Sequence, residues 1–194
     1  MSDGRPNTRE TLLGEAVLLF NEKGFAASGM GLLADRIGIR KSSLYHHVQS
    51  KEELLELALG RAHGMLLTAL HPASPSRTAF GRLESFVRAV PDRPDRELPC
   101  IQLLLGPDGW SAAGARTDIE RRVAELIRRA ADEGTVRQDL PPDLCAGLLL
   151  DTIGSALARR STTVPIDVLV ALALGGLREY RTPILPGSSV CPST

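Results

Sequence analysis

The stretch "GIRKSSLYHHVQSKEELL", residues 38–55, combines a glycine turn, basic and hydroxyl side chains, an aromatic residue beside two histidines, and the start of a new helix. No acidic residue lies between Arg36 and Lys51. The whole chain of 194 residues has 23 Lys and Arg against 23 Asp and Glu, so its formal net charge is +0. A neutral chain that gathers positive charge in one short segment builds a local surface for anions; an ordinary solvated helix is the alternative.

The residues around this stretch have the spacing of two short helices joined by a turn. Residues 30–38 place three apolar side chains on one side of a helix and end on Gly38. Residues 41–48 begin a third short helix, whose Leu44 and Val48 would complete a small core. This arrangement is typical of a helix-turn-helix, whose second helix enters the major groove of DNA. A short buried hairpin with an accidental basic face stays open as the alternative.

The exposed side of this helix pair would carry side chains that bind nucleic acids. Arg and Lys neutralise phosphates and donate to guanine edges, Ser and Tyr hydroxyls reach phosphate oxygens, and His can donate to either. Lys51 lies in the first turn of the next helix, where a cation is unfavourable unless a phosphate lies there too. The residues expected to bind DNA are Arg40, Lys41, Ser42, Ser43, Tyr45, His46 and Lys51.

The rest of the chain is predicted to be helical. Aromatic residues make up only 4% and the apolar residues are mainly Leu and Ala, which favours helices over strands. Ser50 and Glu53 form a capping box at the start of a longer helix. We expect an all-α fold with helices at 8–23, 30–38, 41–48, 50–70, 78–90, 100–105, 112–133, 143–160 and 166–180, and no strand.

The last two of these helices, residues 143–160 and 166–180, are apolar on nearly every side. Such helices must be buried on every side, which for a terminal pair indicates a partner subunit. Two plain core helices of a monomer are the alternative. The residues expected at a dimer interface are Ala146, Leu150, Ile153, Gly154, Leu157, Leu169, Leu172, Ala173 and Gly176.

No pattern in the chain indicates a metal site, a cofactor or catalysis. Cys100, Cys145 and Cys191 lie too far apart for a zinc or disulfide motif, and the adjacent pair His46–His47 points in two directions on a helix. The chain shows no signal-peptide core, and its longest apolar run is shorter than the roughly 20 residues that span a bilayer. We expect a cytoplasmic protein that is not an enzyme and does not bind a membrane.

Residues 33–55, "LADRIGIRKSSLYHHVQSKEELL", and 16–28, "AVLLFNEKGFAAS", resemble the DNA-binding signature of the tetracycline-repressor (TetR) family of bacterial transcription regulators. The resemblance implies a three-helix DNA-binding head (residues 1–55), a helical effector-binding and dimerisation body (56–182), and a disordered tail (183–194). It also places Ser42 or Ser43, Tyr45, His46 and Lys51 on positions that touch DNA in the family, and leaves Ser28 as a further contact.

The chain departs from that signature in two single residues and one short segment. Arg40 stands where the family has a small hydroxyl residue as the helix cap, so either the cap is lost, at roughly 1 kcal/mol, or Arg40 serves binding. Val48 replaces an aromatic residue. Residues 29–31, "GMG", lack the threonine or arginine that often touches DNA there.

The resemblance also implies a small-molecule pocket in the body, for which we expect an uncharged or largely apolar effector. Pockets are mostly apolar with a few polar groups. By that criterion the expected pocket residues are Met65, Phe86, Gln102, Leu103 and Trp110.

The sequence therefore predicts a homodimeric, ligand-responsive transcriptional regulator, a repressor, that binds a palindromic operator in double-stranded DNA. A helical ligand-binding or interaction protein without sequence-specific DNA binding is the alternative.

Overall fold

The chain is helical throughout the part that the computed structural model describes, which is residues 8–71, 76–106, 114–159 and 165–178. These residues contain no strand, so the predicted all-α fold is confirmed. Trp110 and residues 183–194 lie outside the described residues. The helices are α1 (Thr8–Lys23), α2 (Met30–Ile37), α3 (Lys41–Leu44), α4 (Lys51–Leu70), α5 (Ala79–Ala89), α6 (Leu98–Leu105), α7 (Ala115–Asp132), α8 (Pro142–Ala158) and α9 (Ile166–Gly175).

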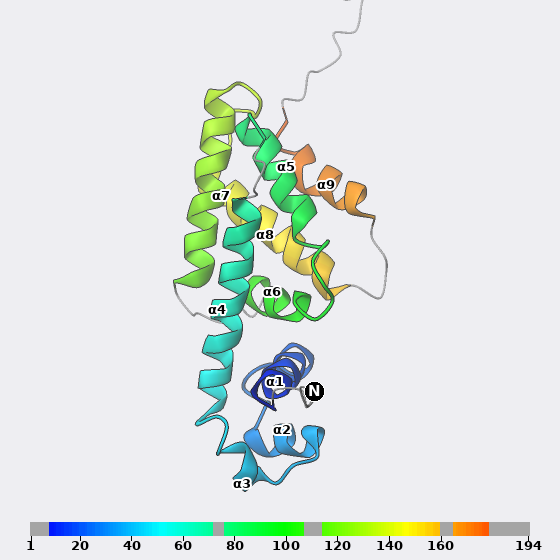
Figure 1. Cartoon of the computed structure of the whole chain (residues 1–194). Helices are drawn as coiled ribbons and strands as arrows, with labels where there is room; N and C mark the ends of the chain where they lie inside the picture. Colours follow the sequence, from blue (N-terminus) through cyan, green and yellow to red (C-terminus); the bar gives the residue numbers. More distant parts are fainter. Residues whose placement is uncertain (1–7, 72–75, 107–113, 160–164, 179–194) are drawn as a thin grey trace, which may run out of the picture.

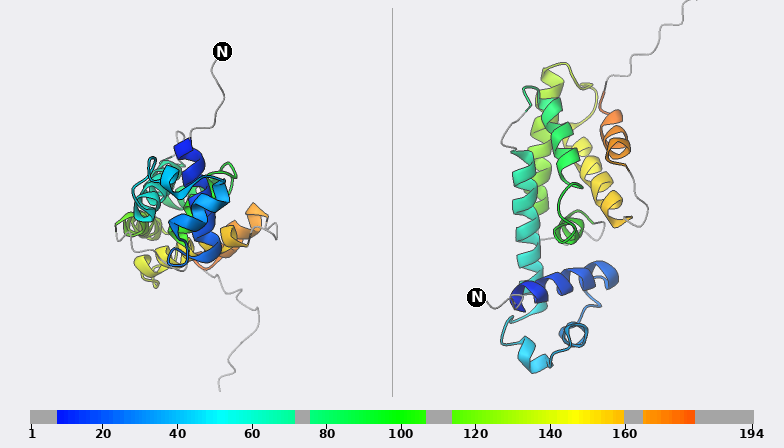
Figure 2. Two further views of the ribbon diagram at one scale, coloured as in Figure 1. Left: turned by 90° about the horizontal axis from the view of Figure 1, so that it is seen from below. Right: turned by 45° about the vertical axis from the view of Figure 1, so that its right-hand side comes forward.

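The molecule is elongated, with α1, α2 and α3 at one end and α5 to α9 at the other (Figures 1 and 2). Helix α4 starts beside α3 and runs into the body, and its 20 residues span about 30 Å. The predicted boundary after residue 55 falls within α4, so a continuous helix connects the head to the body.

Local signals in the sequence set the ends of these helices. Gly24 and Gly38 end α1 and α2 with φ of +76° and +75°, a conformation that favours glycine. The Ser50 hydroxyl accepts from the Glu53 N–H at 3.1 Å and caps α4 as predicted, while the Glu53 carboxylate accepts from the Gln49 N–H at 2.8 Å. Helix α3 is shorter than expected, because residues 45–47 form a turn.

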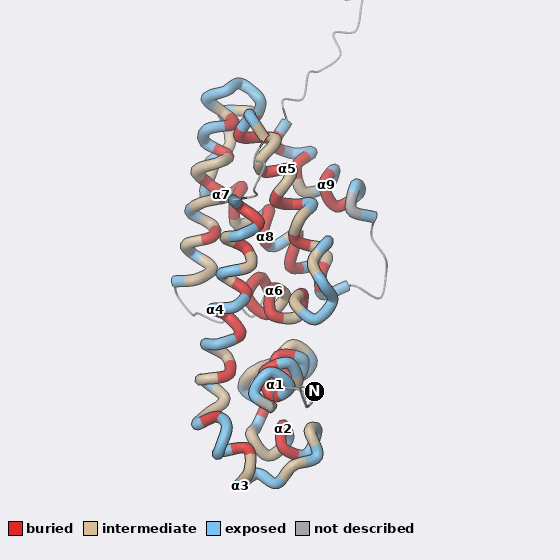
Figure 3. Tube along the Cα trace, in the orientation of Figure 1, coloured by how far each residue is buried: buried red, intermediate tan, exposed pale blue. Residues whose placement is uncertain are grey.

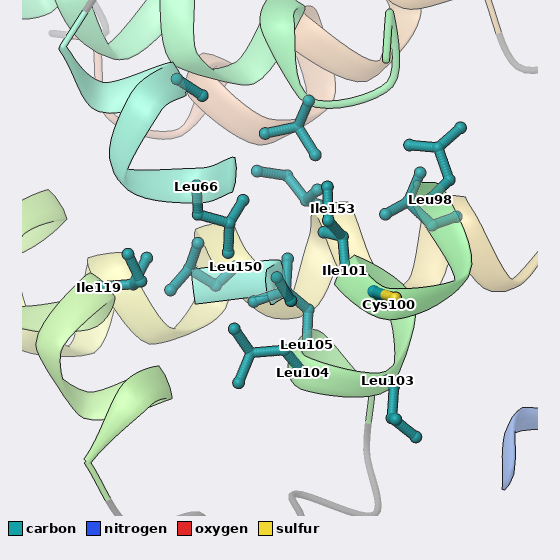
Figure 4. Packing of buried hydrophobic residues seen from close by; sticks show 14 of the residues in the cluster. Leu66, Leu98, Cys100, Ile101, Leu103, Leu104, Leu105, Ile119, Leu150 and Ile153 are labelled. Carbon is teal, nitrogen blue, oxygen red and sulfur yellow. The ribbon is translucent and has the colours of Figure 1, made fainter. Parts of the chain in front are cut away.

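The core of the body surrounds the short helix α6. Ile101 and Leu105 of α6 lie close to Leu150 and Ile153 of α8 in the packed interior (Figure 4). Helices α6 and α8 meet so closely at Gly154 that a Cβ atom there would collide with the backbone carbonyl oxygen of Leu105. This crossing therefore requires glycine.

The two terminal helices bury one side in their own subunit, which corrects most of the predicted dimer interface. Figure 3 shows how buried and exposed residues alternate along these helices. A helix that is apolar all round turns one side to its own core, and the sequence alone does not say which side. Only Leu172 and Gly176 of the predicted set are exposed, and Ala173 is partly buried. The six that pack inside the subunit are Ala146, Leu150, Ile153, Gly154, Leu157 and Leu169.

Candidate nucleic-acid interface

A small apolar core fixes the angle between α2 and α3. Leu33, Ala34, Leu44 and Val48 are buried together, and the Ile39 N–H donates to the Ala34 carbonyl at 3.0 Å across the turn. The helix-turn-helix predicted from residues 30–48 is therefore present. Its compact turn holds α3 at the end of the molecule, away from the body (Figure 1).

Helix α3 and the turn after it present a row of side chains to solvent. Five of the predicted DNA-binding residues are exposed, with Tyr45 47% exposed, whereas Ser43 is partly buried. The six predicted residues on and beside α3 make no side-chain hydrogen bond or ion pair with another described residue, so their donors are available to a ligand. These residues are Arg40, Lys41, Ser42, Ser43, Tyr45 and His46.

Arg40 stands at the N-cap position of α3 without acting as a cap. Its backbone has the extended geometry of an N-cap (φ −71°, ψ 141°), and no side-chain hydrogen bond reaches the first turn. The cap interaction that a hydroxyl residue would supply is therefore missing, as expected from the sequence.

Ser28 lies inside the protein and not on the DNA-facing surface. The residue is 1% exposed, and its hydroxyl lies 2.6 Å from the Gly24 carbonyl oxygen and 3.2 Å from that of Leu19. These contacts stabilise the turn between α1 and α2, so the hydroxyl is not on a surface that a phosphate could reach. The predicted DNA contact from Ser28 is corrected to a structural role.

Lys51 connects the start of α4 to the turn after α1. Its ammonium donates to the Phe25 carbonyl at 3.0 Å and lies 4.2 Å from the centre of the Phe25 ring. The charge remains close to the free N–H groups of the first turn of α4, where a phosphate would be favoured. Lys51 thus has a structural role in addition to its predicted role in DNA binding.

Arg36 joins α2 to α1 through two carboxylates of α1, which lie outside the basic stretch at residues 38–55. Its guanidinium donates to Glu15 at 2.8 Å and to Glu22 at 2.6 and 2.9 Å. The Arg36 hydrogen bonds hold the pKa of Glu22 below its usual value. These glutamates lie seven residues apart, which is about two helical turns, so the sequence already indicated that they share a face of α1. The unpaired basic surface accordingly begins at Arg40.

A hollow of about 720 Å³, here called the α1 hollow, lies where α1 meets the body. It is lined by side chains from residues 10–18 of α1, by Arg61 and Met65 of α4, and by residues 95–100. Its volume falls in the usual range for small-molecule sites.

Of the predicted pocket residues that the structure describes, Met65 alone lines this hollow. Phe86 and Leu103 are instead buried core residues, and Gln102 is partly buried elsewhere. The sequence pointed to apolar body residues in general, whereas the hollow is formed by three segments that only the fold brings together.

One ion pair lies on the lining of the α1 hollow. Arg61 donates to both oxygens of Glu10, at 2.5 and 2.8 Å, and these bonds lower the pKa of Glu10. Burial raises the pKa of the Cys100 thiol to about 11, so this thiol is neutral at physiological pH. Leu13 and Met65 are among the side chains that add apolar surface to the lining, so the hollow can hold the apolar part of a ligand beside its charged groups.

The same hollow lies at the junction of head and body. The Asn21 side-chain amide near the end of α1 donates to the Pro99 carbonyl at 2.9 Å, and Glu10 near the start of α1 pairs with Arg61. A ligand in the hollow would therefore contact α1 and α4 at once. Any change in their spacing would move α3.

Neither a membrane-spanning helix nor a metal-binding cluster occurs among the described residues. No described helix is long and apolar enough to cross a membrane. Nor do three or more His, Cys, Asp or Glu side chains gather within those residues in a way that could hold a metal ion.

Known proteins resemble this chain over nearly its full length. Residues 12–58 match the family described as bacterial regulatory proteins, tetR family. The transcriptional repressor KstR2 of Rhodococcus jostii is 40% identical, with 96% of this chain and 93% of that protein covered.

Solved structures share the architecture. A TetR-family regulator from Streptomyces coelicolor is 35% identical and superposes with a TM-score of 0.72, covering 90% of this chain and 94% of its own. The ketosteroid regulator KstR2 of Mycobacterium tuberculosis (23% identical; TM-score 0.70; 92% and 100% covered) and AibR in complex with isovaleryl coenzyme A and operator DNA (17%; 0.69; 88% and 97%) share the fold.

Proposed function

Because this chain belongs to the TetR family of bacterial regulatory proteins, we propose that it works as a homodimeric repressor that binds a palindromic operator and responds to a small molecule beside its head. It is a DNA-binding transcriptional regulator, as its repressor relatives are. The dimer, the operator symmetry and the position of the effector are the proposed parts.

The observation that carries the proposal is the row of exposed side chains on and around α3. Arg40, Lys41, Tyr45 and His46 face solvent without polar partners among the described residues, on an otherwise neutral chain. A short helix that projects basic and hydroxyl groups from the end of a molecule suits the major groove.

Operator binding can be tested with DNA from the promoter region beside the gene for this chain. We expect a gel shift or an anisotropy change whose affinity falls steeply with salt, because phosphate neutralisation releases counterions. Two heads should protect half-sites spaced by one helical turn, about 34 Å, or a multiple of it. Binding that ignores both the salt concentration and the DNA sequence would contradict the proposal.

A homodimer is supported by the outer sides of α8 and α9. Leu144 and Leu148 on α8, with Val168 and Leu172 on α9, are among the most exposed large apolar side chains of the described residues. Large contiguous apolar patches on a soluble protein mark interaction sites. A second copy of the same helix pair would cover these residues with an apolar surface of matching chemistry.

The α1 hollow is the proposed effector site, because a ligand there contacts both head and body. To act, the ligand must bind one spacing of the heads better than the other. Since KstR2 of M. tuberculosis is described as a ketosteroid regulator and AibR was solved with isovaleryl coenzyme A, both classes of compound should be assayed first. A ligand that binds in the hollow should change operator affinity; Gly14→Leu, which fills the hollow, should abolish this response and keep basal DNA binding.

A further inference from the structure

A second, smaller hollow lies on the body, away from both α3 and the α1 hollow. It has a volume of about 250 Å³ and is formed where the end of α4, at Leu70 and His71, meets α5 and α7. Arg82 of α5 and three arginines of α7, Arg121, Arg122 and Arg129, line it; we call it the arginine hollow. The three helices lie side by side at this end of the molecule (Figures 1 and 2).

Positive charge exceeds negative charge around this hollow. Asp118 accepts from Arg121 at 2.5 Å and from Arg122 at 2.8 Å. Glu125 accepts from Arg129 at 2.9 Å, and also from the neighbouring Arg128 at 2.5 Å. Each carboxylate is thus shared by two arginines of α7, and Arg82 adds a further positive charge. On a chain with a net charge of +0, this is a local excess of cations.

Arg82 differs from the other arginines of the hollow because none of its side-chain nitrogens has a hydrogen-bond partner among the described residues. Its Nε is shielded from solvent and unbonded. A shielded donor without a partner is costly, and for a charged group the cost is larger. Such a group in a native structure calls for an explanation, and an ion that binds to it is one.

The size and the charge of the hollow together define the class of ligand. Its volume lies below the roughly 300–1,000 Å³ of sites that enclose a whole small molecule, so it suits a compact group. The planar guanidinium group binds a pair of phosphate or carboxylate oxygens through two parallel N–H donors. The excess of arginines over carboxylates favours a group with two or more negative charges, which a phosphoryl group has and a single carboxylate lacks.

We propose that the arginine hollow is a binding site for a phosphoryl or diphosphoryl group, either free or as part of a small molecule. Arg82 is its central ligand, and Arg121, Arg122 and Arg129 of α7 surround the anion. The site is separate from the DNA-binding surface, because α4 alone puts about 30 Å between Lys51 and Leu70. It does not depend on the proposed effector site in the α1 hollow.

The test is a titration of the full chain with inorganic diphosphate, followed by calorimetry at constant ionic strength. We expect saturable binding that Arg82→Gln weakens about tenfold or more, since a charge-assisted contact is lost. Arg129→Gln should weaken it as well. Arg88→Gln is the matched control, because it removes the same charge from α5 at a position that does not line the hollow, and neither of its carboxylate partners lines the hollow.

Two measurements keep the test decisive. Arg82→Gln should unfold at the wild-type temperature or above it, because Arg82 has no partner to lose. Lys41→Gln, in the DNA-binding row, should leave diphosphate binding unchanged, which excludes binding to the head. The proposal is overturned if the wild-type chain does not bind diphosphate at millimolar concentration, or if Arg88→Gln weakens binding as much as Arg82→Gln. A free anion and a larger ester are then distinguished by comparing inorganic diphosphate with adenosine diphosphate.

Discussion

Tyr45 is the residue at which DNA binding can be separated from folding. Its ring is 47% exposed and its hydroxyl has no partner among the described residues. We predict that Tyr45→Ala lowers operator affinity about tenfold, through loss of a contact worth roughly 1–1.5 kcal/mol, and leaves the melting temperature unchanged. Fluorescence anisotropy and thermal unfolding measure the two effects.

Lys51→Ala provides the contrast to this variant. It should lower both operator affinity and melting temperature, because Lys51 also bonds to Phe25. A fall in the stability of Tyr45→Ala as large as that of Lys51→Ala would show that Tyr45 supports the fold rather than the DNA contact.

Gly154 is the residue at which the body tolerates no side chain. A Cβ there would strike the Leu105 carbonyl, and both backbones belong to packed helices that cannot move apart freely. We predict that Gly154→Ala destabilises the chain by about 1–3 kcal/mol in urea unfolding. Gly60→Ala, at an exposed position of α4 with open space around it, is the control and should be neutral or stabilising by up to about 1 kcal/mol.

The role of Arg40 can be tested at the start of helix α3. No side chain caps this helix, so Arg40→Ser should supply the missing cap and stabilise the chain by about 1 kcal/mol. If Arg40 binds phosphate, the same variant should bind operator less tightly and with a shallower dependence on salt. Urea unfolding and anisotropy at several salt concentrations measure both quantities. Unchanged operator affinity would mean that Arg40 makes no contact with the DNA.

Helices α8 and α9 carry the prediction about assembly. Leu148 is 57% exposed and Leu172 is 70% exposed, so neither is needed for the core of its own subunit. Leu148→Glu with Leu172→Glu should therefore give a folded monomer in size-exclusion chromatography with light scattering, because the charges would be buried at the interface. Leu57→Glu, at an exposed position of α4, should leave the dimer intact. A double variant that remains dimeric would place the interface elsewhere.

Across the whole molecule, the head is held to the body by α4 and by contacts beside the α1 hollow. Arg61 and Glu10 form an exposed pair, which contributes little to global stability. We predict that Arg61→Gln speeds hydrogen exchange in α1 while it changes the free energy of unfolding by less than about 1 kcal/mol. Arg88→Gln breaks exposed pairs within the body and should not affect α1. Equal exchange in α1 for both variants would show that the pair does not fix the head.

The sequence by itself determined the helices and the kind of head. Helical periodicity, the glycines at 24 and 38, and the Ser50 cap are local signals, and each acts through hydrogen bonds and backbone conformations within a few residues. The basic and hydroxyl row after Gly38 was likewise readable, because neighbouring residues on one short helix share a surface.

Only the tertiary structure decided which sides of these helices face outward and which residues meet. It turned Leu150 and Ile153 inward and Leu148 outward, buried Ser28, and paired Arg36 with carboxylates of α1. It also formed both hollows from segments distant in sequence. These outcomes depend on packing between elements: an all-apolar helix has no side that local chemistry prefers, so the neighbouring helices choose it.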